Sequence, residues 1–169
     1  METSEHRPDR PLIQSLCEVG PAARKLLRQQ GPLREYEASE LHLQIYRQFK
    51  AEHQMNILRN ARVDKKKITE VREYHPRELD QGSITSPEWT ITVFIPLGPI
   101  DTLKPPKVTY QPIKNQLRDT QPIAWQVQHH FQMAGNRRLI VEEGPIHFLM
   151  VQYDWNVVAD RATEGSHQE

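Results

Sequence analysis

The histidines are the side chains of this sequence best suited by type to metal binding or proton transfer, and there are eight of them. A zinc site needs three or four ligands that meet at one point. His129 and His130 are adjacent, so an extended strand would direct them to opposite faces. His42, His53 and His75 fall in a different part of the chain. The spacing favours hydrogen-bonded histidines, and we predict no metal and no cofactor.

Other catalytic signatures are missing from the sequence. It contains no phosphate-binding glycine loop and no HExxH, CxxC or GxSxG pattern. The single cysteine, Cys17, lies beside Leu16 and Val19, where a buried and unreactive thiol is the common outcome. His147 and Asp154 share the last apolar stretch and are the pair that could serve a hydrolase. We therefore expect a non-catalytic protein, with a small hydrolase using an unrecognised His/Asp site as the second alternative.

A basic cluster occupies residues 59–67, RNARVDKKK, with five basic side chains and one acidic one. Each phosphate that such a cluster neutralises releases counterions and adds affinity. Basic residues also collect at the ends of helices because they interact favourably with the helix dipole. Binding to nucleic acid or to an anionic membrane surface is the first alternative function, and the residues that would make the contacts are Arg59, Arg62, Lys65, Lys66 and Lys67.

Composition limits the class of protein. The 169 residues include 22 Lys and Arg against 22 Asp and Glu, so no overall charge attracts the chain to nucleic acid or to a membrane. One cysteine forms no internal disulfide, and no apolar run approaches the roughly 20 residues of a transmembrane helix. Without a secretory signal in the first twenty residues, the expected location is cytoplasmic or nuclear. We predict one domain over 9–158, with disordered tails at 1–8 and 159–169.

The spacing of apolar residues changes near Pro87. Before it, apolar residues recur three and four positions apart, which predicts a helical part over 9–86. One short helix would begin at Pro21 and end at Gly31-Pro32. The longest helix is expected over 33–62, about 45 Å at 1.5 Å per residue. The alternative is two helices broken near 56–60.

After Pro87 the apolar residues alternate, which is typical of strands. Strands are predicted over 88–97, 108–113 and 123–133, with a proline-rich loop over 98–107. Two last strands, 138–142 and 146–155, are predicted to form a hairpin. The final strand is apolar on both faces, so we expect it to be central and covered on both sides. The predicted fold class is α+β, with N-terminal helices (about 9–75) packed on a mostly antiparallel sheet (about 88–158).

These features favour a protein–protein assembly module as the function. The over-long helix, the tryptophans at strand ends and the proline-rich loop are all suited to contact with a protein partner. The partner could be another protein or a second copy of this chain, giving a homo-oligomer. Aromatic residues supply much of the energy of interfaces, and the predicted interface residues are Tyr46, Phe49, Trp89, Trp125 and Trp155.

The stretch 129–154, HHFQMAGNRRLIVEEGPIHFLMVQYD, resembles the terminal hairpin of small matrix proteins of negative-strand RNA viruses. The resemblance covers about 26 residues and contains no diagnostic motif. It implies a self-associating structural protein of matrix type. This chain departs from the family in its balanced charge and its helical first half, and no functional residue is carried over.

Overall fold

The computed structural model describes residues 25–61, 68–71, 75–98, 100–113, 120–127 and 129–155, with the backbone alone for 68–71 and 155. The predicted tails at 1–8 and 159–169, the helical prediction over 9–24 and Cys17 lie outside this part of the chain.

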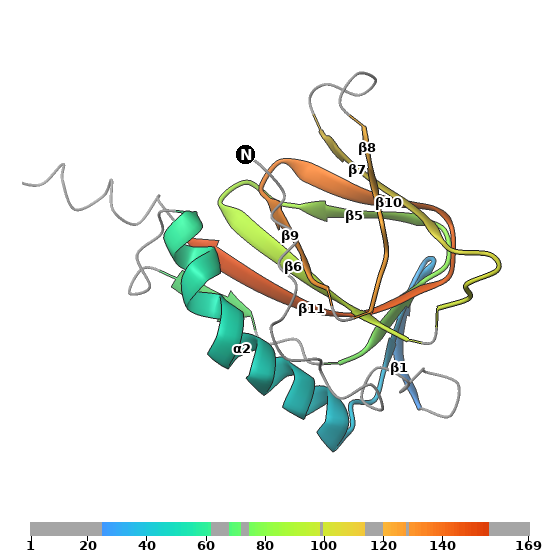
Figure 1. Cartoon of the computed structure of the whole chain (residues 1–169), viewed down its shortest axis with the longest axis horizontal. Helices are drawn as coiled ribbons and strands as arrows, with labels where there is room; N and C mark the ends of the chain where they lie inside the picture. The colour runs from blue at the N-terminus through green and yellow to red at the C-terminus, as the bar shows by residue number, and fades with distance from the viewer. Residues whose placement is uncertain are drawn as a thin grey trace, which may run out of the picture.

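Two antiparallel sheets and one helix make up the described structure (Figure 1). The large sheet has the strand order β1-β2-β4-β11-β6-β9, and β3 pairs with β11 as a seventh strand. The small sheet has the order β5-β10-β7-β8. The large sheet comprises β1 (Leu26–Gln30), β2 (Leu33–Tyr36), β3 (Ile68–Val71), β4 (Arg77–Leu79), β6 (Thr90–Leu97), β9 (Phe131–Ala134) and β11 (Ile146–Trp155), and the small sheet β5 (Gly82–Ser86), β7 (Lys107–Pro112), β8 (Gln121–Ile123) and β10 (Arg137–Glu143).

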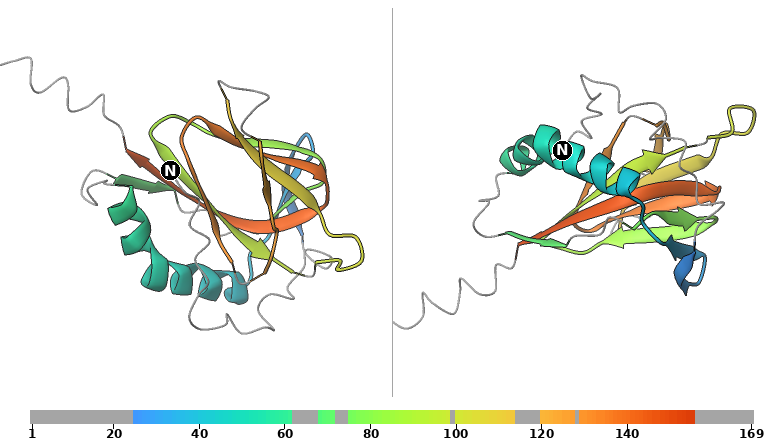
Figure 2. Two further views of the ribbon diagram at one scale, coloured as in Figure 1. Left: turned by 45° about the horizontal axis from the view of Figure 1, so that its top comes forward. Right: turned by 90° about the horizontal axis from the view of Figure 1, so that it is seen from below.

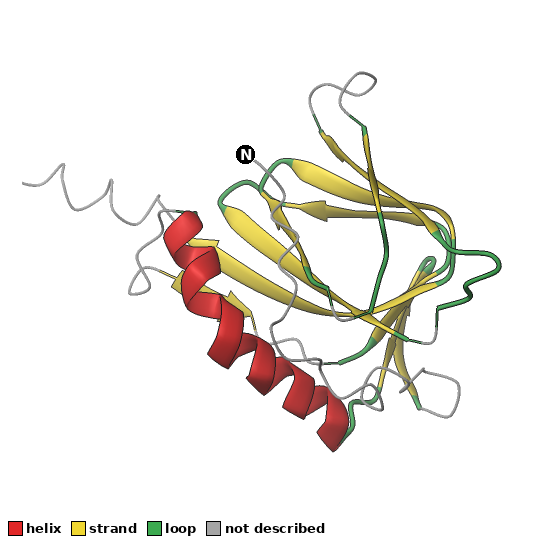
Figure 3. Cartoon of the chain, in the orientation of Figure 1, coloured by secondary structure: helices red, strands yellow, loops and turns green. Residues whose placement is uncertain are grey.

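The predicted α+β arrangement of N-terminal helices packed on a sheet is wrong, because the fold is mostly β. Within the described residues there is one helix, α2 (Glu40–Asn60), and it stands against the strands in Figure 3. The predicted long helix, 33–62, begins instead with strand β2, and Gly31-Pro32 forms a hairpin turn where a helix end was expected. Strands β3, β4 and β5 replace helix over 68–86. The strand β1 is exposed throughout, so no alternation of apolar residues marked it in the sequence.

Helix α2 covers one face of the large sheet. Its first turn is held where the Ser39 backbone N–H donates to Nδ1 of His42 at 3.0 Å. The helix is continuous through Asn56, so the predicted alternative of a break near 56–60 is also wrong. Its buried face packs on the large sheet, and the core between them contains Ile45, Tyr46, Phe49, Ile57, Leu58, Ile91, Val93, Ile95, Leu97, Leu149, Val151 and Tyr153.

The small sheet covers the opposite face. Phe94, Phe148 and Met150 of the large sheet form a second core with Tyr110, Leu139 and other residues of the small sheet. The strand β11 pairs with β3, β4 and β6 and is buried on both faces. Its central position is confirmed, although a helix and a sheet cover it, and not the N-terminal helices that we predicted.

The last two strands do not form the predicted hairpin. β10 belongs to the small sheet and β11 to the large one, so the link through Gly144 crosses from one sheet to the other. A Cβ atom on Gly144 would lie 2.1 Å from the carbonyl oxygen of Asp80, so this glycine serves close backbone approach. The predicted strand 123–133 is likewise wrong in extent, because β8 ends at Ile123 and β9 begins at Phe131.

Candidate functional site: an exposed hairpin and its polar anchor

The β1–β2 hairpin projects from the body of the protein, as the right-hand view of Figure 2 shows. Gly31, at φ +57°, and Pro32 form its turn, and the Gln29 side chain donates to the Gly31 carbonyl at 3.3 Å. A residue with positive φ at such a turn favours glycine. The turn therefore explains why the segment 26–36 doubles back as two strands.

The strand β1 is an edge strand that is open to solvent. All five of its residues are exposed, and among the described strands it pairs only with β2. Leu26 and Leu27 are each 45% exposed and are the first two residues of this strand, next to the register irregularity between Leu26 and Arg28. An edge strand carries a row of unpaired backbone N–H and C=O groups that can pair with another chain. This edge therefore combines backbone donors and acceptors with apolar side chains.

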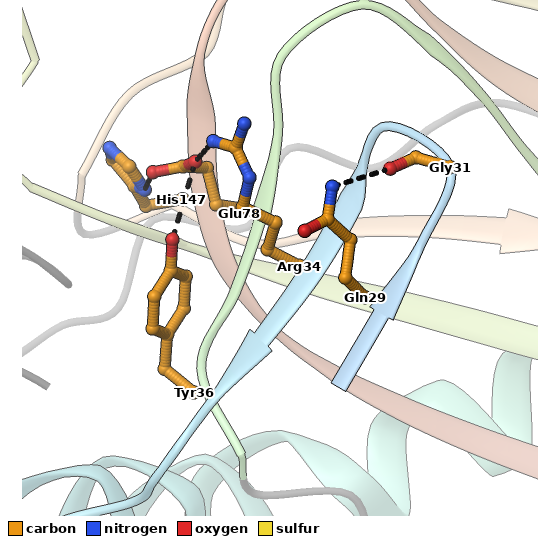
Figure 4. Close-up of polar contacts among 6 residues, drawn as sticks. All are labelled: Gln29, Gly31, Arg34, Tyr36, Glu78 and His147. Carbon is orange, nitrogen blue, oxygen red and sulfur yellow. Dashed lines mark hydrogen bonds and ion pairs between the residues drawn. The ribbon is translucent and has the colours of Figure 1, made fainter. Parts of the chain in front are cut away.

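Glu78 on β4 anchors the hairpin to the sheet on the face that α2 covers. Register places Arg34 of β2, Glu78 and His147 of β11 side by side across three strands. Arg34 donates to Oε1 of Glu78, the Tyr36 hydroxyl lies 3.5 Å from the same oxygen, and Nδ1 of His147 lies 3.5 Å from Oε2 (Figure 4). We call these four residues the Glu78 cluster. It connects the hairpin to the central strand.

Two members of the Glu78 cluster, Arg34 and His147, have shifted pKa values. The hydrogen bond and charge of Glu78 raise the pKa of Arg34. Burial lowers the pKa of His147, and the charge of Glu78 offsets only part of that shift. His147 is therefore neutral at pH 7, and the carboxylate is neutralised by Arg34.

A second ion pair fastens the hairpin on the opposite face. Glu35 of β2 lies directly across from Arg77 of β4. The Nε and Nη2 groups of Arg77 donate to Oε2 of Glu35 at 3.1 and 3.0 Å, and Arg77 is 8% exposed. Charge-assisted hydrogen bonds of this kind are stronger than neutral ones. Polar contacts on both faces thus hold the base of the hairpin while its outer edge stays open.

The Glu78 cluster lacks the parts of a hydrolytic site. No described serine, threonine or cysteine side chain forms a hydrogen bond with His147, so no nucleophile is activated there. The suggested pair of His147 and Asp154 does not form. The two side chains lie on opposite faces of β11, and Asp154 accepts a hydrogen bond from Thr90 at 2.8 Å instead. The geometry suits structural fastening.

The predicted interface residues are placed in different environments. Tyr46, Phe49 and Trp125 lie in the cores of this chain, at 5%, 4% and 5% exposure. Trp89 follows β5 at φ 63° and is 49% exposed, so it is the predicted tryptophan that reaches the surface in the described part. The Trp155 side chain is outside that part. The structure does not bring the five residues together on one surface.

Of the five residues of the predicted basic contact surface, only Arg59 lies in the described part of the chain. Arg59 is exposed in the last turn of α2, where a basic side chain also complements the helix dipole. Arg62, Lys65, Lys66 and Lys67 lie outside the described residues.

The buried histidines do not gather into a metal site. The rings of His53 and His130 are 4.7 Å apart, and Phe49 lies against both. Over the described ranges, no group of three or more His, Cys, Asp or Glu side chains is arranged to hold a metal ion. Of the adjacent pair, His129 is only half-buried, while His130 is 5% exposed.

Comparison with protein-family models, with curated proteins and with solved structures finds no match to this chain. Within the described residues, no helix is long and apolar enough to cross a membrane. A function for this chain is therefore inferred from its own geometry. The hairpin was missed from the sequence, and its one usable signal was Gly31-Pro32 between two short runs that each contain leucine.

Proposed function

We propose that this chain is a non-catalytic assembly protein that self-associates by strand addition along β1. The observation that carries the proposal is the outer edge of β1, with which no described strand pairs, and on which every residue, Leu26 and Leu27 included, is exposed. Strand addition joins chains through backbone hydrogen bonds, while the side chains that alternate along the strand provide selectivity.

The side chains of β1 give it little protection from such pairing. Natural edge strands are commonly blocked by charges, prolines, bulges or a covering segment. Arg28 is the one charged residue of β1, and the register irregularity between Leu26 and Arg28 is its one distortion. Of the five large exposed hydrophobic side chains in the described structure, two are in this strand. Two large apolar side chains are therefore exposed along an edge strand that carries one charge.

Anchoring by Glu78 and Arg77 supports the proposal because it orders the edge before a partner arrives. A preorganised binding surface avoids the entropy cost of ordering the strand on association. The anchor residues face the two sides of the sheet, and no described strand pairs with the outer edge of β1.

Light scattering coupled to size-exclusion chromatography tests the proposal. The parent protein is expected to elute as a dimer or a larger oligomer at tens of micromolar. The double variant Leu26→Lys/Leu27→Lys should be monomeric, because charges on an edge oppose strand pairing. Its melting temperature should stay within a few degrees of the parent value, since both positions are exposed.

The matched control is Leu103→Lys, which changes a leucine that is 96% exposed outside the hairpin. It should leave the oligomeric state unchanged. A monomeric parent protein, or a double variant that still forms the parent oligomer, would contradict self-association through β1.

A further inference from the structure

A pocket of about 380 Å³ lies at the β9 edge of the large sheet, opposite the β1 edge. Its wall is formed by the end of α2, by β6 and β9 of the large sheet, and by β7, β8 and β10 of the small sheet. This volume is within the range of about 300–1,000 Å³ typical of small-molecule sites. Most of its wall is apolar and includes Ile91, Phe94, Ile123, Phe131, Met133 and Leu139. The pocket involves none of the hairpin residues.

Arg137 is the one charged residue among the described residues of the pocket wall. Its guanidinium lies 5.9 Å from the centre of the Tyr110 ring, and Tyr110 is held in turn by a hydrogen bond from its hydroxyl to Gln121. No described carboxylate forms an ion pair or a hydrogen bond with the Arg137 side chain. Arg137 is half-buried, carries five N–H donors and lies in a mostly apolar wall, and the contact that the structure describes for its guanidinium is with the Tyr110 ring.

We propose that this pocket binds a small amphipathic anion, of which an aliphatic monocarboxylate is the simplest form. The carboxylate would accept two parallel hydrogen bonds from Arg137, and the aliphatic tail would contact Phe94, Phe131 and Met133. The proposal goes beyond self-association and does not depend on it, because β1 and β9 are the opposite edges of the large sheet.

The residues of the pocket wall favour both the carboxylate and the aliphatic tail of the proposed ligand. A purely polar anion would leave the aromatic and aliphatic side chains in contact with water, and would gain nothing from them. A purely apolar ligand would bury the guanidinium without a partner, which is costly. A carboxylate on an aliphatic chain satisfies both parts of the wall. The neutral side chains Asn60 and Gln132 also line the pocket and add no competing charge.

Calorimetric titration with octanoate, 1-octanol and acetate tests the two parts separately. Octanoate is expected to bind most tightly, 1-octanol more weakly, and acetate not measurably. In Arg137→Gln, octanoate affinity should fall about tenfold or more, because a charge-assisted hydrogen bond is lost, while 1-octanol affinity stays the same. The matched control is Arg138→Gln, which removes the same charge from the next residue of β10, on its other face and outside the pocket wall.

Filling the pocket gives a second test. Ala61→Phe should abolish binding of both octanoate and 1-octanol, and Ala134→Phe fills the pocket from β9 if the first variant does not fold. Amide chemical shifts should move in β9, β10 and the end of α2. No binding of octanoate at millimolar concentration, equal loss in Arg137→Gln and Arg138→Gln, or shift changes confined to other strands would each overturn the proposal.

Discussion

The two edge strands of the large sheet, β1 and β9, differ in how far they are buried and in where the chain goes after them. At β1 every residue is exposed, and the strand is followed by a two-residue turn back into the same sheet. At β9, Phe131 and Met133 are 6% and 5% exposed. The chain then turns through Gly135 and Asn136 into β10 of the small sheet, so the second sheet covers one face of β9.

This difference separates two kinds of binding. An edge that continues into a second sheet buries its side chains and leaves a pocket at the junction, which suits a small ligand. An edge that returns on itself leaves its backbone groups open, which suits another strand. If the two edges differ in this way, substitutions at β1, at β9 and in the strand between them should have separable effects.

The largest loss of stability is expected from a substitution in the middle of the large sheet. Leu149 on β11 is 0% exposed and lies between α2 and the strands. Leu149→Asp would bury an unpaired charge, so no soluble folded protein is expected. Leu149→Met keeps the volume and should cost less than about 1.5 kcal/mol of unfolding free energy. Soluble yield and circular dichroism measure both. A soluble, folded Leu149→Asp protein would show that position 149 tolerates a charge, and would contradict the assignment of β11 to the buried centre of the sheet.

A glycine at each edge gives the next test. A Cβ atom on Gly135, beside β9, would lie 2.5 Å from the Pro87 carbonyl oxygen, so Gly135→Ala should cost about 2 kcal/mol or more. Gly31, in the β1–β2 turn, has nothing within 4 Å of its Cβ position, and only its φ of +57° opposes a side chain. Gly31→Ala should cost about 1 kcal/mol, and Gly31→Asn less. Urea unfolding ranks the variants, and a larger loss for Gly31→Ala would reverse the comparison.

The sequence predicted the regular parts of this fold and missed its edges. Alternation of apolar residues located β6 closely, and the predicted strand 108–113 matches β7 to within one residue at each end. A run that is apolar on both faces placed β11 at the centre, because a strand covered on both sides needs apolar side chains on both. β1 left no such signal, since an exposed strand needs no apolar face. The interface residues were expected among aromatic side chains, yet Phe49 and Trp125 fill the cores. Neither the register that joins Glu78 to His147 nor the pocket beside Arg137 could be inferred, because both depend on pairing between distant segments.

A smaller effect is expected at the anchor of the β1 edge. Glu78→Gln removes the carboxylate charge that Arg34 neutralises beside His147, and should lower the free energy of unfolding only modestly, because Arg34 is partly exposed and solvent screens its attraction to the carboxylate. Amide hydrogen exchange should become faster in β1 and β2 and stay unchanged in β9. The control, Glu142→Gln, alters an exposed side chain and should change stability by less than about 0.5 kcal/mol. Equal acceleration in β9 would mean that the edges are not independent.

The smallest effect is the pH dependence that His147 contributes at the β1 anchor. Burial lowers its pKa in the folded state from the ordinary value of 6.5, so the folded protein binds this proton less readily than the unfolded chain. The stabilisation is complete above about pH 6.5 and is lost as the pH falls toward the lower folded pKa, at no more than about 1.4 kcal/mol per pH unit for one proton. His147→Gln should therefore reduce the fall in unfolding free energy below about pH 6.5, and urea titration at several pH values measures this fall. The control is His129→Gln, on the β9 side of the molecule, which should keep the fall that His147 causes. Parallel curves for the parent and His147→Gln would show that the anchor does not sense protonation, and that the ion pairs of Glu78 and Arg77 hold the β1 edge equally well across this pH range.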